Sequence, residues 1–161
     1  MYKLYAKQKV FKIVDDYQIF DEEKNPVYQV DQDFTFFGHR VEVKKLNSDL
    51  TFLIEKVIPT LLASYTVDFS DGTGFRVEQE FSLFRQRITV ISDYYQLQLE
   101  GEVFSFDFDI FNGEDLVGHI EREWLAWGDT YTITVIDPVF EEELVALMIV
   151  VDHLLDMADN R

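Results

Sequence analysis

The stretch of sequence that decides the fold is EEELVALMIVVDHLL, residues 141–155. Just before it, Asp137 can cap a helix and Pro138 suits the first helical position. The three glutamates place negative charge in the first turn, where the helix dipole favours it. The apolar run LVALMIVV then makes the helix apolar on every side, so it must be enclosed. Because this run is much shorter than the roughly 20 residues that span a bilayer, we predict a helix over about 138–157 that lies inside the protein.

Before this helix the chain repeats one pattern six times: an aromatic or aliphatic pair, a short polar turn and an alternating apolar strand. The copies start 21 to 24 residues apart, at Lys9, Asp33, Lys56, Glu80, Glu102 and Glu123. In the second strand of each copy, alternate residues are apolar, which is typical of half-buried antiparallel strands. These alternating residues are Tyr17 and Ile19, Val41 and Val43, Tyr65 and Val67, Ile88 and Val90, Phe108 and Ile110, and Tyr131 and Ile133.

Polar turn signals separate the copies at residues 21–26, 46–49, 71–74, 92–93 and 112–113. The last of these, Asn112-Gly113, is the strongest short hairpin signal, and we expect both residues to adopt positive φ. Two strands per copy give about twelve strands, and a meander of that length closes to remove its edges. Two strands are too few for a propeller blade, and no regular Gly or Asp lattice indicates a β-helix.

We therefore expect a mainly β, single-domain fold over residues 1–161. About twelve antiparallel strands, over roughly residues 4–136, form a closed barrel that encloses the C-terminal helix. A barrel of this size is wider than side chains alone can fill, and the helix supplies the missing volume.

Composition limits the function classes. The formal net charge is −17, divided as −4 over residues 1–80 and −13 over residues 81–161. Such a surface repels phosphate, which argues against nucleic acid and against docking on anionic lipid through a general basic face. The 47% hydrophobic content excludes a disordered acidic chain. The chain has no Cys, and MYKLYAKQKVFKIVDD has no apolar core of a secretory signal, so we expect a cytoplasmic protein.

The beginning of the chain is locally basic, with four lysines that alternate with apolar residues. We favour their assignment to the solvent face or guarded edge of the first strand over a small cationic patch for an anionic partner. These lysines are Lys3, Lys7, Lys9 and Lys12.

Candidate site residues are few. His39, at an expected turn, His119, in a strand, and His153, in the helix, have no metal-ligand spacing, so we assign them packing or surface roles. The segment DFDIFNGED resembles a calcium loop but has Phe111 where an oxygen ligand is required and Gly113 one residue too late. Its acidic residues are expected to gather at most a weak surface cation; they are Asp107, Asp109, Glu114 and Asp115.

Other candidates for chemistry are weaker. DGTG at 71–74 lacks the Lys of a phosphate loop and is expected to form a hairpin turn. Trp124 and Trp127 are interpreted as barrel-wall positions. Glu121 and Glu123 share a strand face, whereas a glycosidase needs its carboxylates across a cleft. No serine lies in a G-x-S-x-G or S-x-x-K context. We expect no catalytic, cofactor-binding or metal-ligating residues and no cofactor.

Three stretches carry a resemblance to a known family: KQKVFKIVDDYQIFDEEKNPVYQV from Lys7, WLAWGDTYTITV from Trp124 and EEELVALMIVVDHLLDMA from Glu141. Together they resemble the LURP-one-related family of the tubby C-terminal superfamily, which also contains phospholipid scramblases. The resemblance implies a twelve-stranded antiparallel barrel around a hydrophobic C-terminal helix. It also implies kinship to proteins that bind phosphoinositides or act at membranes, although this chain lacks their rich basic surface.

The function expected from the sequence is that of a non-enzymatic cytosolic binding or scaffold protein of the LURP-one-related type. Its partner is an unknown protein or lipid, not nucleic acid, and no segment spans a membrane. Two alternatives stay open: a peripheral membrane or phospholipid-binding module, and a hydrolase with an acidic cleft.

Overall fold

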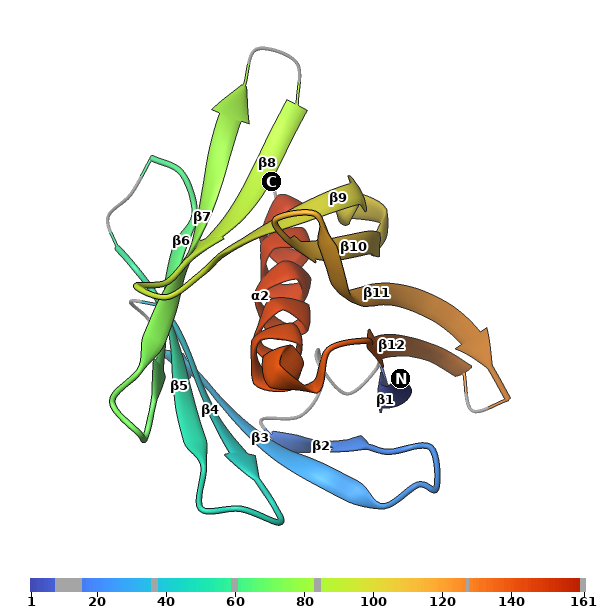
Figure 1. Ribbon diagram of the computed structural model, residues 1–161. Helices are drawn as coiled ribbons and strands as arrows, with labels where there is room; N and C mark the ends of the chain where they lie inside the picture. Colours follow the sequence, from blue (N-terminus) through green and yellow to red (C-terminus); the bar gives the residue numbers. More distant parts are fainter. Residues whose placement is uncertain (8–15, 36–37, 59–60, 83–84, 127, 160–161) are drawn as a thin grey trace.

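The computed structural model describes residues 1–7, 16–35, 38–58, 61–82, 85–126 and 128–159. They form a closed antiparallel barrel around one helix, as predicted (Figure 1). Every strand pairs with its sequence neighbours, and β1 pairs with β12 to close the barrel. The strands are β1 (Tyr2–Lys7), β2 (Asp16–Phe20), β3 (Pro26–Thr35), β4 (Gly38–Lys45), β5 (Thr51–Lys56), β6 (Ser64–Phe69), β7 (Gly74–Ser82), β8 (Arg85–Ile91), β9 (Gln96–Glu102), β10 (Asp107–Asn112), β11 (Asp115–Leu125) and β12 (Gly128–Val135).

The predicted repeat corresponds to pairs of strands in this barrel. The second strand of each copy is an even-numbered strand, from β2 to β12. All twelve alternating apolar residues predicted for these strands are buried in the core, with none more than 5% exposed. The period-two pattern therefore identified the inner face of every second strand, because alternate side chains of a strand point to opposite faces.

The five predicted turn segments lie between each even-numbered strand and the strand that follows it. One of them differs in detail from the prediction. Asn112 is paired with Asp115 across the β10–β11 hairpin, so the two-residue loop is Gly113-Glu114. Gly113 has φ +64°, whereas neither Asn112 nor Glu114 has positive φ. Glycine at the first loop position is the type II′ preference, and the loop begins one residue later than expected.

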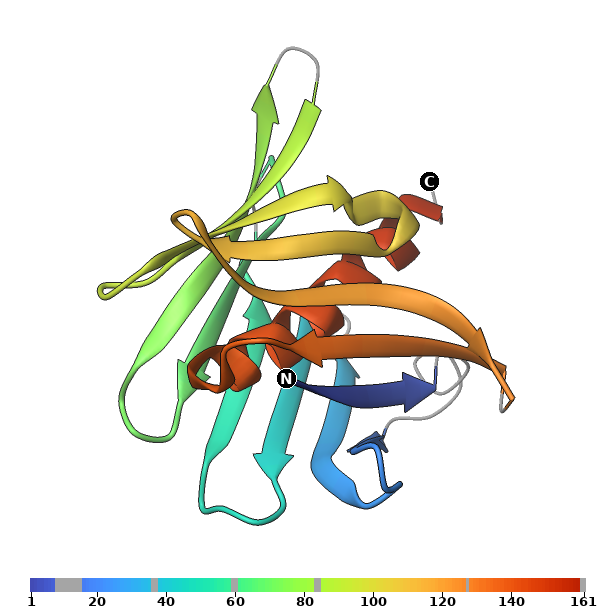
Figure 2. The same ribbon diagram turned by 45° about the vertical axis from the view of Figure 1, so that its right-hand side comes forward.

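The C-terminal helix has the predicted start and runs through the middle of the barrel (Figure 2). A short 3₁₀ turn, η2 (Pro138–Phe140), leads into helix α2 (Glu141–Asp159). The Asp137 side chain accepts a hydrogen bond of 3.1 Å from the Val139 amide and so caps this turn. Residues 144–151 are at most 1% exposed. Each large aliphatic side chain buried in this way contributes about 1.5–3 kcal/mol, so the helix is the centre of the core.

One glycine lets the barrel wall approach the helix closely. A Cβ atom at Gly118, on β11, would lie 2.5 Å from Leu144 Cδ1 and 2.7 Å from Leu144 Cδ2. Both distances are far below van der Waals contact, so a larger residue here requires the end of the Leu144 side chain to shift or to be shortened.

The first strand is not an edge, since β1 pairs with both β12 and β2. Its Lys3 and Lys7 alternate with the buried Leu4 and Ala6, which confirms a solvent-facing role for these two lysines. The other two lysines of the basic stretch, Lys9 and Lys12, lie outside the described residues. Among the described residues, no helix has the length and apolar character needed to cross a bilayer.

Candidate metal centre on the outer wall

The acidic first turn of α2 makes hydrogen bonds and an ion pair with side chains of the barrel strands. Tyr2 donates a 2.5 Å hydrogen bond to Glu141 Oε1, Tyr28 donates one to Oε2, and Lys45 Nζ lies 2.9 Å from Oε2. Burial raises the pKa of Glu141, but these three partners outweigh burial and hold its pKa below the usual range. Tyr95 donates a 2.8 Å hydrogen bond to Glu143 Oε1, and burial raises the pKa of Glu143 because this one partner does not outweigh it. These glutamates are therefore occupied in anchoring the helix.

The other end of α2 is anchored by hydroxyl and imidazole groups. Tyr131 donates a 2.6 Å hydrogen bond to Asp152, and Tyr65 Oη lies 2.5 Å from His153 Nδ1. The His153 ring stacks on His39 with a centroid distance of 3.8 Å. Burial lowers the pKa of His39 to about 3 and that of His153 to about 4, so both are neutral at neutral pH. His39 thus lies buried in β4, packed on the helix, and not in the turn that the sequence predicted.

The third histidine lies on the outer wall, among carboxylates. In the β10–β11 hairpin, Asp107 pairs with Glu121 and Asp109 pairs with His119. Paired residues of an antiparallel ladder share a face. The core holds Phe108, Ile110 and Ile120, which alternate with these four residues, so all four side chains point outward.

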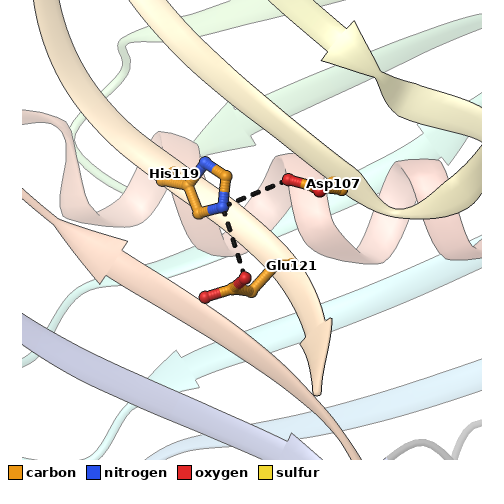
Figure 3. Close-up of side chains that lie close together, drawn as sticks. All are labelled: Asp107, His119 and Glu121. Carbon is orange, nitrogen blue, oxygen red and sulfur yellow. Dashed lines mark ion pairs between the residues drawn. The ribbon is translucent and has the colours of Figure 1, made fainter.

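The three side chains drawn in Figure 3 converge on one point in front of the hairpin. His119 Nε2 lies 3.4 Å from Asp107 Oδ1 and 3.6 Å from Glu121 Oε2. One ligand atom from each residue lies within 4.8 Å of the other two. His119 Nδ1 lies 2.8 Å from Asp109 Oδ1, within hydrogen-bond distance. An imidazole oriented by one carboxylate and facing two others is an arrangement able to hold a metal ion or a proton.

A bulge in β11 produces this arrangement. Ile110 pairs with Gly118 but Phe111 pairs with Leu116, so Val117 is an extra residue on β11. The Val117 carbonyl accepts hydrogen bonds from the amides of Ile136 (3.0 Å) and Asp137 (2.9 Å). We call Asp107, Asp109, His119 and Glu121 the outer-wall cluster. The bulge thus connects this cluster to the segment that precedes the helix.

The structure separates the acidic residues that the sequence grouped together. Asp107 and Asp109 lie in the cluster, whereas Glu114 and Asp115 lie at the exposed hairpin turn. His119 and Glu121 were not grouped with these aspartates in the prediction. The sequence does contain a signal, since Asp107-x-Asp109 and His119-x-Glu121 lie on two strands joined by one hairpin. Only knowledge of the bulge, however, shows that Asp107 aligns with Glu121 and Asp109 with His119.

The remaining predicted positions are placed as follows. Glu123 lies beyond Glu121 on the outer face of β11 and accepts a 2.6 Å hydrogen bond from Thr132. Asp71 accepts hydrogen bonds from Thr73 in the turn between β6 and β7, as a hairpin turn requires. Trp124 belongs to β11, but its side chain and the whole of Trp127 lie outside the described residues.

Comparison with known proteins places this barrel in a family. The LURP-one-related family model matches residues 2–152. The chain is also 23% identical over 158 residues to the uncharacterised protein YxjI of Bacillus subtilis (strain 168), covering 96% of this chain and 94% of that protein. No solved structure matches the chain significantly. Because the family model spans nearly all of the barrel and its central helix, the chain belongs to the LURP-one-related family.

Proposed function

We propose that this LURP-one-related protein is a non-enzymatic cytosolic binding or scaffold protein whose partners bind to the outer wall of the barrel. The observation that carries the proposal is the filled interior. Residues 144–151 of α2 are at most 1% exposed and occupy the position that a ligand takes in an empty barrel. Binding in the interior therefore requires the helix to leave.

The polar groups at both ends of the helix support the same proposal. Asp152, His153 and Glu141 each have a tyrosine partner on a barrel strand, and Glu143 has Tyr95 in the turn before β9, so these polar groups hold the helix in place. Among the described residues, Glu141 and Glu143 are the only buried carboxylates, so the other acidic side chains described in this chain of net charge −17 reach the surface, and charged surfaces select partners and steer their approach.

A reversible tether between the helix and the wall tests this proposal. The chain has no cysteine, so the double variant Gly118→Cys/Leu144→Cys offers one disulfide between the close neighbours on β11 and α2. Photo-crosslinking groups at Gln98 and Glu100, both exposed on β9, then capture partners in native lysate. We expect the oxidised and the reduced protein to capture the same partners, since the helix stays in the barrel throughout.

Two results contradict the proposal. If capture occurs only after reduction, the helix has to leave the barrel for binding. If lipid extraction and mass spectrometry show a stoichiometric lipid, or if the protein floats with phosphoinositide vesicles, the peripheral membrane alternative replaces the proposal. A matched protein with only Leu144→Cys controls for the effect of the substitution itself.

A further inference from the structure

In the part of the chain that the structure describes, the carboxylates of the outer-wall cluster outnumber its one imidazole. On β9, Glu102 pairs with Asp107 and Glu100 pairs with Asp109, on the opposite side from β11. Five carboxylates therefore lie on three adjacent strands of this face, which carries one imidazole: Glu100, Glu102, Asp107, Asp109 and Glu121. Among the described residues, the ion pairs made by Asp107, Asp109 and Glu121 all go to His119. Like charges directly opposite each other destabilise a sheet, so this face favours a bound cation.

The distances favour a metal ion over hydrogen bonds alone. His119 Nε2 lies 3.4 Å from Asp107 Oδ1 and 3.6 Å from Glu121 Oε2, both longer than a normal N–H···O hydrogen bond. With bonds of roughly 2.0–2.2 Å from the metal to its ligands, the edges of a tetrahedral zinc site are about 3.3–3.6 Å long. The two separations therefore match the edges of such a site.

The remaining ring nitrogen has the partner that metal-binding histidines usually have. Asp109 Oδ1 lies 2.8 Å from Nδ1, and a carboxylate there accepts the Nδ1 proton. This hydrogen bond fixes the tautomer in which the Nε2 lone pair faces Asp107 and Glu121. The exposed fractions of 26% for His119 and 66% for Asp107 leave the site open to an ion from solvent.

We propose that His119 Nε2, Asp107 and Glu121 bind a divalent first-row transition-metal ion, with zinc as the representative ion and Asp109 as the positioning residue. The fourth position is open to water or to a group from a partner. An imidazole ligand selects against Ca²⁺ and Mg²⁺, which take oxygen ligands.

Calorimetric titration of the full chain with ZnCl₂, after removal of metal by a chelator, tests the proposal. We expect one equivalent to bind, and we expect His119→Gln, Asp107→Asn and Glu121→Gln each to weaken binding by at least about 10-fold. Asp109→Asn should also weaken binding, by about 10-fold, since partners of metal ligands have effects of this size. The visible absorption of bound Co²⁺ should show four-coordination in the wild type and be lost in His119→Gln.

Glu114→Gln and Asp115→Asn are matched controls, because each removes one negative charge from the same hairpin without touching the cluster. Both should bind zinc as the wild type does. The proposal is overturned if the wild type does not bind zinc, or if His119→Gln binds it with unchanged affinity. It is also overturned if Ca²⁺ or Mg²⁺ binds as tightly as zinc, which is the behaviour of an acidic surface alone. None of these results bears on the filled interior, so the proposed function is tested separately.

Discussion

The barrel has two clusters of carboxylates that differ in their surroundings. The inner cluster is Glu141 and Glu143 at the start of α2, and the outer-wall cluster contains Asp107, Asp109 and Glu121. Inside, Glu141 takes two tyrosine hydroxyls and Lys45, and it is 9% exposed. Outside, Asp107 and Glu121 face each other across two strands and share one imidazole. Glu141 is held by fixed partners in the protein, whereas Asp107 and Glu121 share one imidazole and, in our proposal, a bound cation.

This difference predicts that the inner carboxylate Glu141 contributes to the stability of the fold, whereas the outer carboxylates contribute little to it. Removing the charge of a buried, paired carboxylate leaves its partners unsatisfied, which is costly. Removing one of several exposed carboxylates relieves repulsion and costs little. Stability measurements can therefore distinguish residues that hold the helix from residues that are free to bind a ligand.

The largest effect is expected in the apolar part of the helix, which lies in the hydrophobic core. Met148 is fully buried at the middle of α2, and Met148→Asp places a charge among apolar groups. We expect a loss of at least about 4 kcal/mol in the free energy of unfolding, or no folded protein at all. Urea denaturation followed by circular dichroism measures this loss. Met148→Leu, which conserves volume, should cost less than about 1.5 kcal/mol; an unchanged melting temperature in Met148→Asp contradicts central burial.

A smaller effect is expected when the inner cluster loses its charge. Glu141→Gln keeps the shape of the side chain but breaks the ion pair with Lys45 and replaces one of the two oxygens that accept hydrogen bonds from Tyr2 and Tyr28. We expect a loss of about 2–4 kcal/mol. Glu142→Gln is the matched control, since Glu142 contacts only the Lys45 ammonium among these groups, and it should cost less than about 1 kcal/mol. Equal losses in the two variants contradict a special role for Glu141.

The histidine pair at the other end of α2 predicts a pH dependence. Burial lowers the pKa of His39 to about 3 and that of His153 to about 4, while both groups have ordinary pKa values in the unfolded chain. The unfolded state therefore binds more protons below about pH 6.5, so stability is complete above that pH and falls as the pH is lowered. We expect about 1 kcal/mol per histidine at pH 5.5.

Denaturation curves at pH 7.5, 6.5 and 5.5 measure this dependence. His39→Gln and His153→Gln should each flatten it, because the substituted side chain takes up no proton. A wild-type stability that is constant over this range contradicts the assignment of two neutral buried histidines.

The smallest effect is expected at the outer cluster in the absence of metal. Asp107→Asn and Glu121→Gln remove like-charge repulsion on the wall and should change the free energy of unfolding by no more than about 0.5 kcal/mol, toward greater stability. Excess zinc should raise the melting temperature of Asp107→Asn by less than that of the wild type and of Asp115→Asn, because a native state that binds the ion more weakly is stabilised less by it. A large loss of stability in Asp107→Asn without metal contradicts the contrast between the two clusters.

Most of the fold was predictable because its signals are local. The alternation of residues such as Val41 and Val43 is read within a single strand, and all twelve such residues are buried as predicted. The polar cap and the apolar run of α2 are likewise read within a few turns, and Asp137 caps the start as predicted. The assignment of Asn112-Gly113 as the loop was wrong by one residue, since φ at these positions is fixed by the pairing of both strands and not by the dipeptide alone.

The candidate site was less predictable, because it depends on the alignment of two strands. Asp107 and Asp109 were recognised as acidic groups, but their partners were expected at the turn and lie on β11 instead. If Val117 were paired with Ile110 in a regular ladder instead of forming a bulge, Asp107 would face Ile120 and the two sets of polar side chains would no longer share a face. The pairing of His39 with His153 was missed for a related reason, since one is on the wall and the other on the helix.

By itself, the sequence determined a barrel of twelve strands around one helix, because strand alternation and an all-round apolar segment are properties of neighbouring residues. Only the tertiary structure decided which polar groups meet. Closure around the helix buried Glu141 beside Tyr2 and Tyr28, from β1 and β3, and a one-residue bulge in β11 placed His119 between two carboxylates. The physical reason is that the burial pattern of a residue is set along the chain, whereas the charge partners of a residue are set by strand register and by helix placement across the barrel.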